Sequence, residues 1–392
     1  MNIQKNKGRV LVALSGGVDS SVALYLLQEQ GYQVIGAHMK LWDFSEVGGE
    51  MKKDGRCCSI EAIDDCRAIC NKIGVPFYVL NFVDRFRREV IENFVSEYRA
   101  GRTPNPCIIC NTRLKWESFL KRALELGCDY MATGHYSSIR THPRTGRYYV
   151  EPGCDRSRDQ SYALWGLTQE ALARTLLPLG EIPKSRVREL ARQHEVRTAE
   201  KPESREICFV TDDNYRRFLR EWEARRGADF TGGEIVDESG ETVGRHDGVE
   251  FYTIGQRKGL GVFRPDPTYV KSIDPVTHQI TVSDGGALLE NEFEVGGVNW
   301  MAIEEPRESI EAQVKIRYLS QAAAATITPV SAGRVSIRLH EKQRALTPGQ
   351  SAVFYRDNMT LGGGVIDRVS SRRQKPVFDS KIDSKIDSEL VK

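Results

Sequence analysis

The chain has 392 residues, a length that predicts two or three domains rather than one. Its hydrophobic share of 40% and charged share of 28% are typical of a globular protein with packed cores, and no apolar stretch is long enough for a membrane-spanning helix. The 56 basic and 54 acidic residues give a formal net charge of +2, which excludes a highly charged disordered protein.

The first half of the chain alternates short apolar runs with stretches of helical spacing. The apolar runs predict strands at residues 10–14, 34–39, 77–81 and 130–133. The spacing predicts helices from the glycine turn after residue 14 to Leu27, and at 60–73, 86–98 and about 115–126. Ser59 and Gly74 suit the two ends of the second of these helices. The alternation predicts an α/β domain at 1–208 with a Rossmann-like, doubly wound parallel sheet.

Short strand-like segments replace this pattern after about residue 210. They occur at residues 234–243, 249–254, 269–282, 312–318, 324–329, 335–340 and 351–355. Turn signals at this spacing predict a small β-rich central domain at 209–283 and a C-terminal β-barrel at 284–371. Residues 372–392 contain a repeated polar tetrapeptide and are predicted to form a disordered tail.

The most specific motif is the segment 15–21, Ser-Gly-Gly-Val-Asp-Ser-Ser, between a predicted buried strand and a predicted helix. Its glycines allow a tight turn with exposed backbone N–H groups, and its serines add hydroxyl donors. The positive end of the helix dipole points at the same place. The segment therefore predicts a cradle for a polyphosphate. It is not a Walker A loop, because the lysine of that motif is absent.

Cys107 and Cys110 follow the sequence Thr-Pro-Asn-Pro, in which two prolines restrict the backbone. We place Cys110 near a helix N-terminus with Arg113 and Lys115, an environment that stabilises a thiolate and lowers its pKa. The alternative is a pair of helix-start cysteines without chemistry. A zinc site is less favoured, because no second ligand pair lies at suitable spacing. Cys208 lies in a polar loop where the sequence pattern changes, so it could move between positions.

The nine cysteines form an odd number in a long chain, which predicts reduced thiols and a cytoplasmic protein. Cys66 and Cys70 share one face of the helix predicted at 60–73, so we expect them to pack in a core. We place the adjacent pair Cys57 and Cys58 in a surface loop.

Arginines are concentrated within 60 residues of the N-terminal half. They include Arg99, Arg102, Arg113, Arg140, Arg144, Arg147, Arg156 and Arg158. Arginine pairs with phosphate in a bidentate manner, so this band is consistent with a nucleic-acid backbone footprint. A solvated surface is the alternative, and charge alone does not decide between the two.

Several motifs, in their order along the chain, resemble those of one known family. They are Ser15–Ser21, Gly101–Asn111 (Gly-Arg-Thr-Pro-Asn-Pro-Cys-Ile-Ile-Cys-Asn), Ala132–Tyr136 (Ala-Thr-Gly-His-Tyr), Arg158–Tyr162 (Arg-Asp-Gln-Ser-Tyr), Cys208 and Phe251–Gly259 (Phe-Tyr-Thr-Ile-Gly-Gln-Arg-Lys-Gly). Together they extend from about residue 9 to 370 and are similar to the tRNA-specific 2-thiouridylases, in the N-type ATP pyrophosphatase superfamily. The resemblance implies cleavage of ATP to AMP and pyrophosphate, and replacement of the C2 oxygen of the wobble uridine in tRNA by sulfur.

The resemblance also implies roles for particular residues. It implies ATP binding by Ala13, Leu14, Ser15, Gly16, Gly17, Val18, Asp19, Ser20, Met39 and Gly134, with Asp19 holding Mg²⁺ or orienting the phosphates. It implies contacts with the target base for Asn105, Pro106 and Cys107, and with tRNA for His135, Arg158, Asp159, Gln160, Arg317, Tyr318 and Gln350. Cys110 would be the nucleophile. Cys208 would carry a persulfide whose sulfur comes from a cysteine desulfurase, a sulfur-relay protein or free sulfide.

Cys107 departs from the family pattern, because many members have Asp at this position. With Asp, the implied route uses a persulfide on Cys208, and release of its sulfur by Cys110 leaves a disulfide between the two. With Cys107, three thiolates could instead hold a [4Fe–4S] cluster that has one iron open to hydrosulfide. Two other classes compete with thiolation. A different ATP pyrophosphatase synthetase would give Cys110 and Cys208 no role, and a non-enzymatic RNA-binding module would leave the phosphate loop unused.

Overall fold

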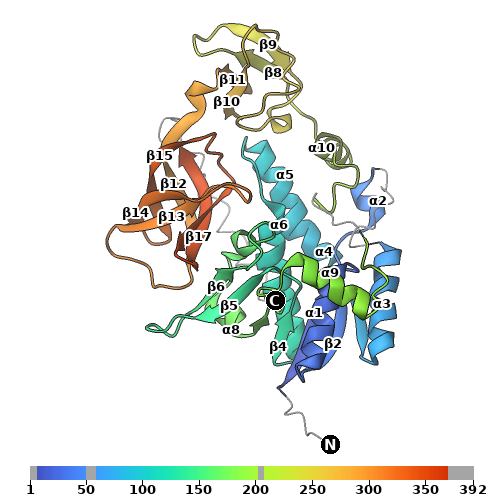
Figure 1. Ribbon diagram of the computed structural model, residues 1–392. Coiled ribbons are helices and arrows are strands. Elements are labelled where there is room, and N and C mark those ends of the chain that lie inside the picture. Colours follow the sequence, from blue (N-terminus) through green and yellow to red (C-terminus); the bar gives the residue numbers. More distant parts are fainter. Residues whose placement is uncertain (1–6, 50–58, 202–206, 370–392) are drawn as a thin grey trace, which may run out of the picture.

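A five-stranded parallel sheet, in the order β3-β2-β1-β4-β7, forms the centre of the N-terminal domain (Figure 1). The computed structural model describes residues 7–49, 59–201 and 207–369. The strands of this sheet are β1 (Arg9–Leu14), β2 (Gln33–Lys40), β3 (Phe77–Asn81), β4 (Tyr130–Ala132) and β7 (Thr175–Leu176). The strands predicted in this half of the chain are therefore present. The two-residue strand β7 is an addition that no sequence pattern indicated.

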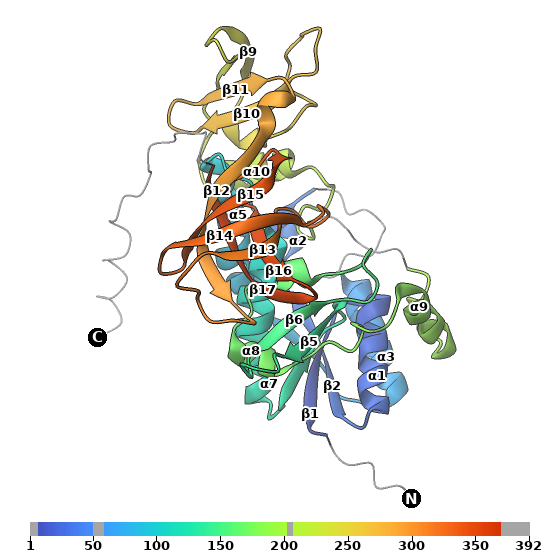
Figure 2. The same cartoon turned by 60° about the vertical axis from the view of Figure 1, so that its left-hand side comes forward.

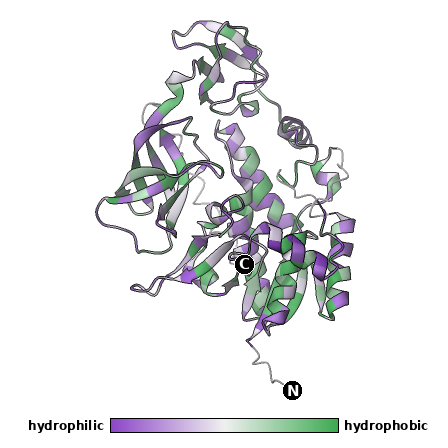
Figure 3. Cartoon of the chain, in the orientation of Figure 1, coloured by the Kyte–Doolittle hydropathy of each residue, from purple (hydrophilic) through white to green (hydrophobic). Residues whose placement is uncertain are grey.

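Helices cover both faces of this sheet, as the doubly wound pattern predicts. The helices of this domain are α1 (Val18–Glu29), α2 (Phe44–Val47), α3 (Ile60–Ile73), α4 (Val83–Phe86), α5 (Glu92–Arg99), α6 (Pro106–Ile109), α7 (Leu120–Glu125), α8 (Gln169–Ala173) and α9 (Lys184–Gln193), of which α1, α3 and α7 contact the strands most directly. Val10 and Val12 of β1 pack in one core with α1, α3 and α9, whereas Leu11 packs in a second core with the helices around α4 and α7. Figure 3 shows hydrophobic residues gathered on α1 and hydrophilic ones on α9.

Two long helices each contain a π-helical segment. The segment η1 (Arg87–Ile91) joins α4 to α5, and η2 (Cys110–Phe119) joins α6 to α7. The helix predicted from about Lys115 begins earlier, at Pro106, because the Asn105 side chain accepts a hydrogen bond from the Ile108 N–H and proline suits the first helical position. The ends predicted for α3 are confirmed: Ser59 accepts a hydrogen bond from the Ala62 N–H, and Gly74 has a φ of 71°.

A four-stranded sheet, in the order β10-β11-β8-β9, forms the central domain and follows helix α10 (Tyr215–Ala224). Its strands are β8 (Gly233–Val236), β9 (Thr242–His246), β10 (Tyr269–Asp274) and β11 (Gln279–Ser283). The strand predicted at 249–254 is wrong, because residues 249–251 form a 3₁₀ turn. Val249 and Phe251 are both buried in the shared core, so the apolar residues that suggested a strand serve tertiary packing instead.

A closed barrel, in the order β12-β15-β14-β13-β16-β17, forms the C-terminal part. Its strands are β12 (Leu289–Trp300), β13 (Ile310–Lys315), β14 (Ala323–Ser331), β15 (Arg334–Arg344), β16 (Ser351–Arg356) and β17 (Met359–Val369). The barrel packs beside the hairpin of β5 (Ser137–Thr141) and β6 (Tyr148–Pro152), while the central sheet stands at the far end from β1 (Figure 1 and Figure 2).

Strands β12 and β17 were not predicted, because glycines interrupt their apolar pattern. Those glycines allow the two strands to approach closely: a Cβ atom on Gly364 would lie 2.7 Å from the carbonyl oxygen of Gly296. Of the helices in the described ranges, none combines the length and hydrophobicity that crossing a membrane requires. The predictions for the tail at 372–392 and for the pair Cys57 and Cys58 lie outside the described residues.

Replacement of Gly364 by alanine is expected to destabilise the protein by about 1 to 3 kcal/mol, because the added Cβ would press on β12. It would lie 2.5 Å from Cγ1 of Val295 as well as against Gly296. Gly285→Ala is the matched control, since its Cβ would make ordinary contacts and its φ of −71° suits alanine. Urea unfolding of both variants measures the difference. Equal stability of the two variants would contradict the close approach of the strands.

Candidate active site

A cavity of about 330 Å³ opens where β1, β2 and β4 end. In doubly wound folds, ligands bind at this carboxyl edge of the sheet. The strand ends and the first turn of α1 contribute Ala13, Leu14, Ser15, Asp19, Ser20, His38, Met39, Leu41, Thr133, Gly134 and His135. The remaining wall comes from the two π-containing helices and two further segments, with Phe86, Val90, Pro106, Cys107, Cys110, Asn111, Lys115, Gln160, Ile207, Cys208 and Phe209.

The predicted phosphate loop lies between the end of β1 and the start of α1. Gly16 has a φ of +73°, and a Cβ atom there would lie 2.7 Å from the carbonyl oxygen of Ala62, so glycine is required. Gly17 is the N-cap of α1 and offers no side chain to the first turn, which leaves backbone donors for a ligand. Val18 was predicted to bind ATP, but its side chain is buried in the core, so its contribution is limited to the backbone.

Asp19 is held by two residues that sequence reasoning did not identify. Nζ of Lys184 lies 2.7 Å and 2.9 Å from its two carboxylate oxygens, and the Tyr136 hydroxyl donates to Oδ1 at 2.6 Å. Lys184 is 7% exposed and opens helix α9. The ion pair joins residues 165 positions apart, so no local pattern indicates it. It brings a lysine to a loop whose own sequence has none.

The helix that begins at Pro106 brings Cys107 and Cys110 to the cavity. Asn105 caps this helix, and Cys110 begins its π-helical segment. Cys110 therefore lies one turn inside the helix, after the N-terminus at which we expected it. Cys107 is exposed and Cys110 is partly buried, so both are accessible from the cavity they line.

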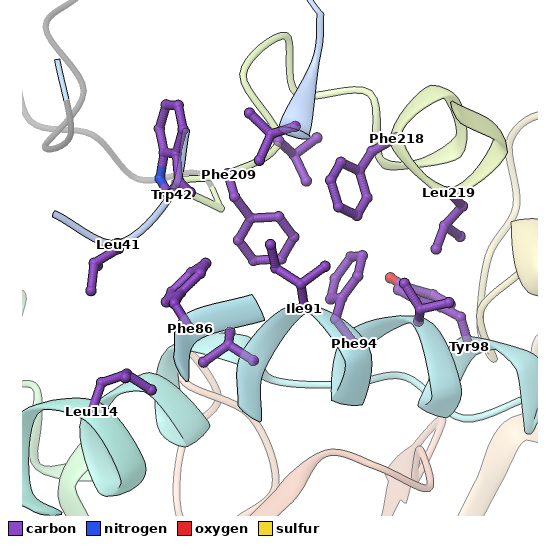
Figure 4. Close-up of a cluster of buried hydrophobic side chains, with 14 of the residues drawn as sticks. Leu41, Trp42, Phe86, Ile91, Phe94, Tyr98, Leu114, Phe209, Phe218 and Leu219 are labelled. Atoms are coloured by element: carbon purple, nitrogen blue, oxygen red, sulfur yellow. The ribbon is translucent and has the colours of Figure 1, made fainter. Parts of the chain in front are cut away.

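Cys208 reaches the same cavity from a segment that is anchored on its C-terminal side. The next residue, Phe209, is 1% exposed and packs edge-on against Phe86 and Phe94, with ring centroids 5.7 Å and 5.2 Å away (Figure 4). Phe218 of α10 closes the cluster at 5.1 Å from Phe209. The aromatic cluster fixes the backbone beside Cys208 while the thiol, which is partly buried, faces the cavity.

Cys66 and Cys70 pack in the core, as predicted, and are at most 1% exposed. Burial raises the pKa of each thiol to about 12, so neither is a thiolate at physiological pH. Burial also raises the pKa of Cys128. These three thiols are buried, whereas Cys107, Cys110 and Cys208 are at least partly exposed where they line the cavity.

His135, a predicted tRNA contact, lies in the cavity wall next to Gly134. Its Nδ1 is 2.6 Å from the Thr133 hydroxyl oxygen. Burial, assisted by the positive charge of Lys115, lowers the pKa of His135 well below its usual range. The imidazole is therefore neutral at physiological pH.

The predicted tRNA contacts at 158–160 have different surroundings. Asp159 is 8% exposed and accepts hydrogen bonds from the backbone of Gly153 and from the backbone and hydroxyl of Ser161, so it shapes this loop. Gln160 lines the cavity and accepts a hydrogen bond from the Tyr136 N–H. Arg158 is partly exposed.

Two of the three predicted tRNA contacts of the barrel, Arg317 and Gln350, line a second cavity of about 420 Å³. Arg317 donates to the carbonyl oxygens of Arg344 and Ala345, and Gln350 donates to those of Thr103 and Pro104. Tyr318 is 39% exposed beside the buried Tyr162. Gln350 thus connects the barrel to the loop that precedes the predicted base-binding residues.

Most of the arginine band serves contacts within the chain. Arg113 pairs with Glu117, and Arg156 donates to the side chain of Asn358. Arg99 pairs with Glu223, Arg102 with Glu97 and Asp367, and Arg140 with Glu151 and Glu181. Arg147 donates to the carbonyl oxygens of Trp300 and Met301. Arg102 and Arg147 connect the barrel to the N-terminal domain. These arginines therefore stabilise the fold and are not simply solvated surface residues.

No dedicated metal site forms among the described residues, because no three His, Cys, Asp or Glu side chains come close enough to hold an ion. Cys107, Cys110 and Cys208 line one cavity without forming such a group. Asp19 is the one carboxylate among the described lining residues, so it is the candidate partner for a cation that arrives with a polyphosphate.

Three family models match the chain: a tRNA methyl transferase HUP domain at residues 8–212, a tRNA methyl transferase PRC-barrel domain at 225–284, and an aminomethyltransferase beta-barrel domain at 290–366. The tRNA-specific 2-thiouridylase MnmA 1 of Clostridium botulinum (strain Loch Maree / Type A3) is 46% identical over 362 residues, covering 92% of this chain and 100% of that protein. The tRNA-specific 2-thiouridylase MnmA of Carboxydothermus hydrogenoformans is 47% identical over 361 residues, which cover 92% of this chain and 98% of that protein. The domain descriptions mention methyl transfer, whereas these full-length relatives are named for thiolation.

Alkylation should separate the two groups of cysteines. At pH 8, iodoacetamide is expected to modify Cys107, Cys110 and Cys208 at least about 100-fold faster than Cys66 and Cys70, because a thiol with a raised pKa has little thiolate at that pH. Peptide mass spectrometry of the native protein measures these rates, and protein unfolded in guanidinium provides the control in which all cysteines react alike. Comparable native rates for Cys66 and Cys110 would contradict the buried assignment.

Proposed function

We propose that this chain, which belongs to the family of tRNA-specific 2-thiouridylases, replaces the C2 oxygen of the wobble uridine in tRNA with sulfur at the expense of ATP. One observation carries the proposal: Ser15, Asp19 and Ser20 of the phosphate-loop segment and three thiols line the same cavity. Activation of a carbonyl oxygen requires the first feature, and delivery of sulfur requires the second. Methyl transfer, which the domain descriptions mention, would give the thiols and the phosphate loop no joint role.

The first step is adenylation of the uridine. The O2 atom forms a bond to the α-phosphorus of ATP, the bond from that phosphorus to the bridging oxygen breaks, and pyrophosphate leaves with the electron pair. The N3 proton passes to solvent. Gly17 and the first turn of α1 supply the backbone donors that we assign to the phosphates. Adenylation is needed because a urea-like oxygen is a poor leaving group until it is part of AMP.

The second step transfers sulfur from a persulfide on Cys208. Its terminal sulfur attacks C2, the C2–O2 bond breaks, and AMP leaves with the electron pair. The Cys110 thiolate then attacks Sγ of Cys208, and the bond to the transferred sulfur breaks, so 2-thiouridine departs with that pair. A Cys110–Cys208 disulfide remains and is reduced by a dithiol before the next turnover.

The remaining assignments follow from this reaction. We assign ATP to residues 13–20 with Met39 and Gly134, the target base to residues 105–107, and tRNA contacts to His135, Arg158, Asp159, Gln160, Arg317, Tyr318 and Gln350. Asp19 would hold Mg²⁺, which neutralises phosphate charge when bound. We assign catalysis to residues 1–208, with the central domain at 209–283 and the tRNA-binding barrel at 284–371. A sulfur donor such as a cysteine desulfurase supplies the persulfide, and the reduced thiols this requires favour the cytoplasm.

Synthesis of 2-thiouridine on unmodified tRNA tests the function and the route together. The anaerobic reaction contains ATP, Mg²⁺, cysteine and a cysteine desulfurase, and compares iron-loaded protein with protein stripped by a chelator. We expect equal product from both, measured by nucleoside mass spectrometry. Product from the loaded protein alone would overturn the persulfide route in favour of a cluster. Absence of product from both, with pyrophosphate release that depends on an amino acid, would assign the chain to another synthetase. Binding of tRNA without ATP turnover would instead indicate an RNA-binding module.

Serine variants should separate the two steps. Cys110→Ser and Cys208→Ser are each expected to reduce 2-thiouridine formation below about 1% of the wild-type rate, since each removes a reacting sulfur. Adenylation needs neither thiol, so Cys208→Ser should still release about one pyrophosphate per enzyme when tRNA is present. Cys128→Ser, which changes a buried thiol outside the cavity, is the matched control and should retain full activity. Full thiolation by Cys208→Ser would exclude the persulfide carrier.

A further inference from the structure

Lys115 lines the cavity but has no role in the reaction as proposed. Its Nζ donates a hydrogen bond to Oδ1 of Asn111 at 2.8 Å, and Nδ2 of Asn111 donates to the carbonyl oxygen of Ala163 at 3.0 Å. Asn111 is 3% exposed, so this chain of hydrogen bonds holds the lysine in a defined place. A lysine ammonium has three donors, and the side-chain amide of Asn111 occupies one of them.

The π-helical segment explains why Lys115 and Cys110 share one cavity. In a π-helix the backbone hydrogen bond runs from residue i to residue i+5, so residues five apart lie above one another. Cys110 and Lys115 are five apart within η2. In an α-helix, residue i+5 would be rotated well away from residue i, because side-chain neighbours there are three and four apart.

Lys115 lies on the side of the cavity that adjoins the phosphate loop. Its charge contributes to the lowered pKa of His135, which shows that the two side chains are near each other. His135 follows Gly134, and a Cβ atom on Gly134 would lie 2.8 Å from the backbone nitrogen of Ser20. The backbone after β4 is therefore in contact with the start of α1. Lys115 is thus connected to the start of α1 through His135 and Gly134, and it shares the cavity with the thiols.

The charges around the cavity leave Lys115 uncompensated. Asp19 is the one carboxylate among the described lining residues, and it is paired with Lys184. Within the described part of the chain, no ion pair involves Lys115. A partly buried cation with spare donors is stabilised by an anionic ligand, and the phosphate of ATP or of an adenylate is an anion that this reaction supplies.

We propose that Lys115 is a catalytic residue that binds the non-bridging oxygens of the α-phosphate during adenylation and during departure of AMP. The inference rests on the proposed function and adds a residue to it. While the O2–phosphorus bond forms and pyrophosphate leaves, the ammonium group donates to the oxygens of the α-phosphate, where negative charge is concentrated. When the C2–O2 bond later breaks, the same group stabilises AMP. Lys115 keeps its protons throughout, so no further reactant is required.

Pyrophosphate release in the Cys208→Ser background isolates the first step, because sulfur transfer cannot follow. Adding Lys115→Met to this background is expected to slow the tRNA-dependent release of pyrophosphate by about 100-fold or more, the usual effect of removing a donor to developing charge. Lys115→Arg keeps the positive charge, so it should release pyrophosphate at least tenfold faster than Lys115→Met. Lys121→Met, on the exposed side of the same helix, is the matched control and should match the parent rate.

Three results would overturn the proposal. One is a pyrophosphate rate for Lys115→Met within threefold of the parent in protein that unfolds at the parent's temperature. Another is a slowed release that saturating tRNA restores to the parent rate, which would make Lys115 a substrate-binding contact. The third is an upward shift of one unit or more in the pH profile of Cys110 alkylation, which would assign the lysine to the thiolate. If the Cys208→Ser parent itself releases no pyrophosphate with tRNA, the proposed function fails. That result is distinct from a failure of the inference about Lys115, in which the parent releases pyrophosphate and the variant does so equally fast.

Discussion

The parallel pairing of β1 with β2 and β4 is the constraint on which the candidate site depends. In this register Leu14 lies opposite His38, and Val12 lies opposite Ala132, so all three strands run out at the same edge. The loop after β1 and the backbone at Gly134 are then forced into contact, with space for no side chain at Gly134. A phosphate cradle alone needs only one strand and one helix. Because three strands end together, residues that follow β2 and β4 form a wall beside the loop, and a cavity results.

The thiol-bearing helix is held in place by the barrel as well as by its own domain. Gln350 donates to Thr103 and Pro104, directly before the Asn105 cap. Gly349 has a φ of +89°, and a Cβ atom there would lie 2.7 Å from the carbonyl oxygen of Thr103, so this junction has no room for a side chain. Trp165 adds a hydrogen bond from Nε1 to the Ser351 hydroxyl. The barrel therefore sets the position of the helix start that carries Cys107 and Cys110.

Local patterns predicted those parts of the fold whose causes are local. The caps of α3 and the buried strands of the parallel sheet depend on residues within a few positions of each other. The turn at residue 16 was visible from its glycines, although glycine is required there because of Ala62, which is distant in the sequence. Prediction failed where distant contacts decide: the segment 249–254 is apolar because it fills a core, and β17 contains glycines because β12 presses against it. The candidate site divides in the same way. Its loop and cysteines are visible in the sequence, whereas the partner of Asp19 is not.

The absence of a lysine from the phosphate loop does not leave the site without cations. Lys184 arrives from the start of α9, and Lys115 arrives from a π-helical turn. Their environments differ: Lys184 is neutralised by Asp19, which lowers the cost of burying it, whereas Lys115 is steadied by a neutral amide that leaves its charge uncompensated. A lysine already paired with a carboxylate offers a ligand less net attraction than an unpaired one. Because Coulombic attraction is stronger in a partly desolvated cavity than in water, the unpaired lysine is the one suited to respond when charge moves onto a phosphate.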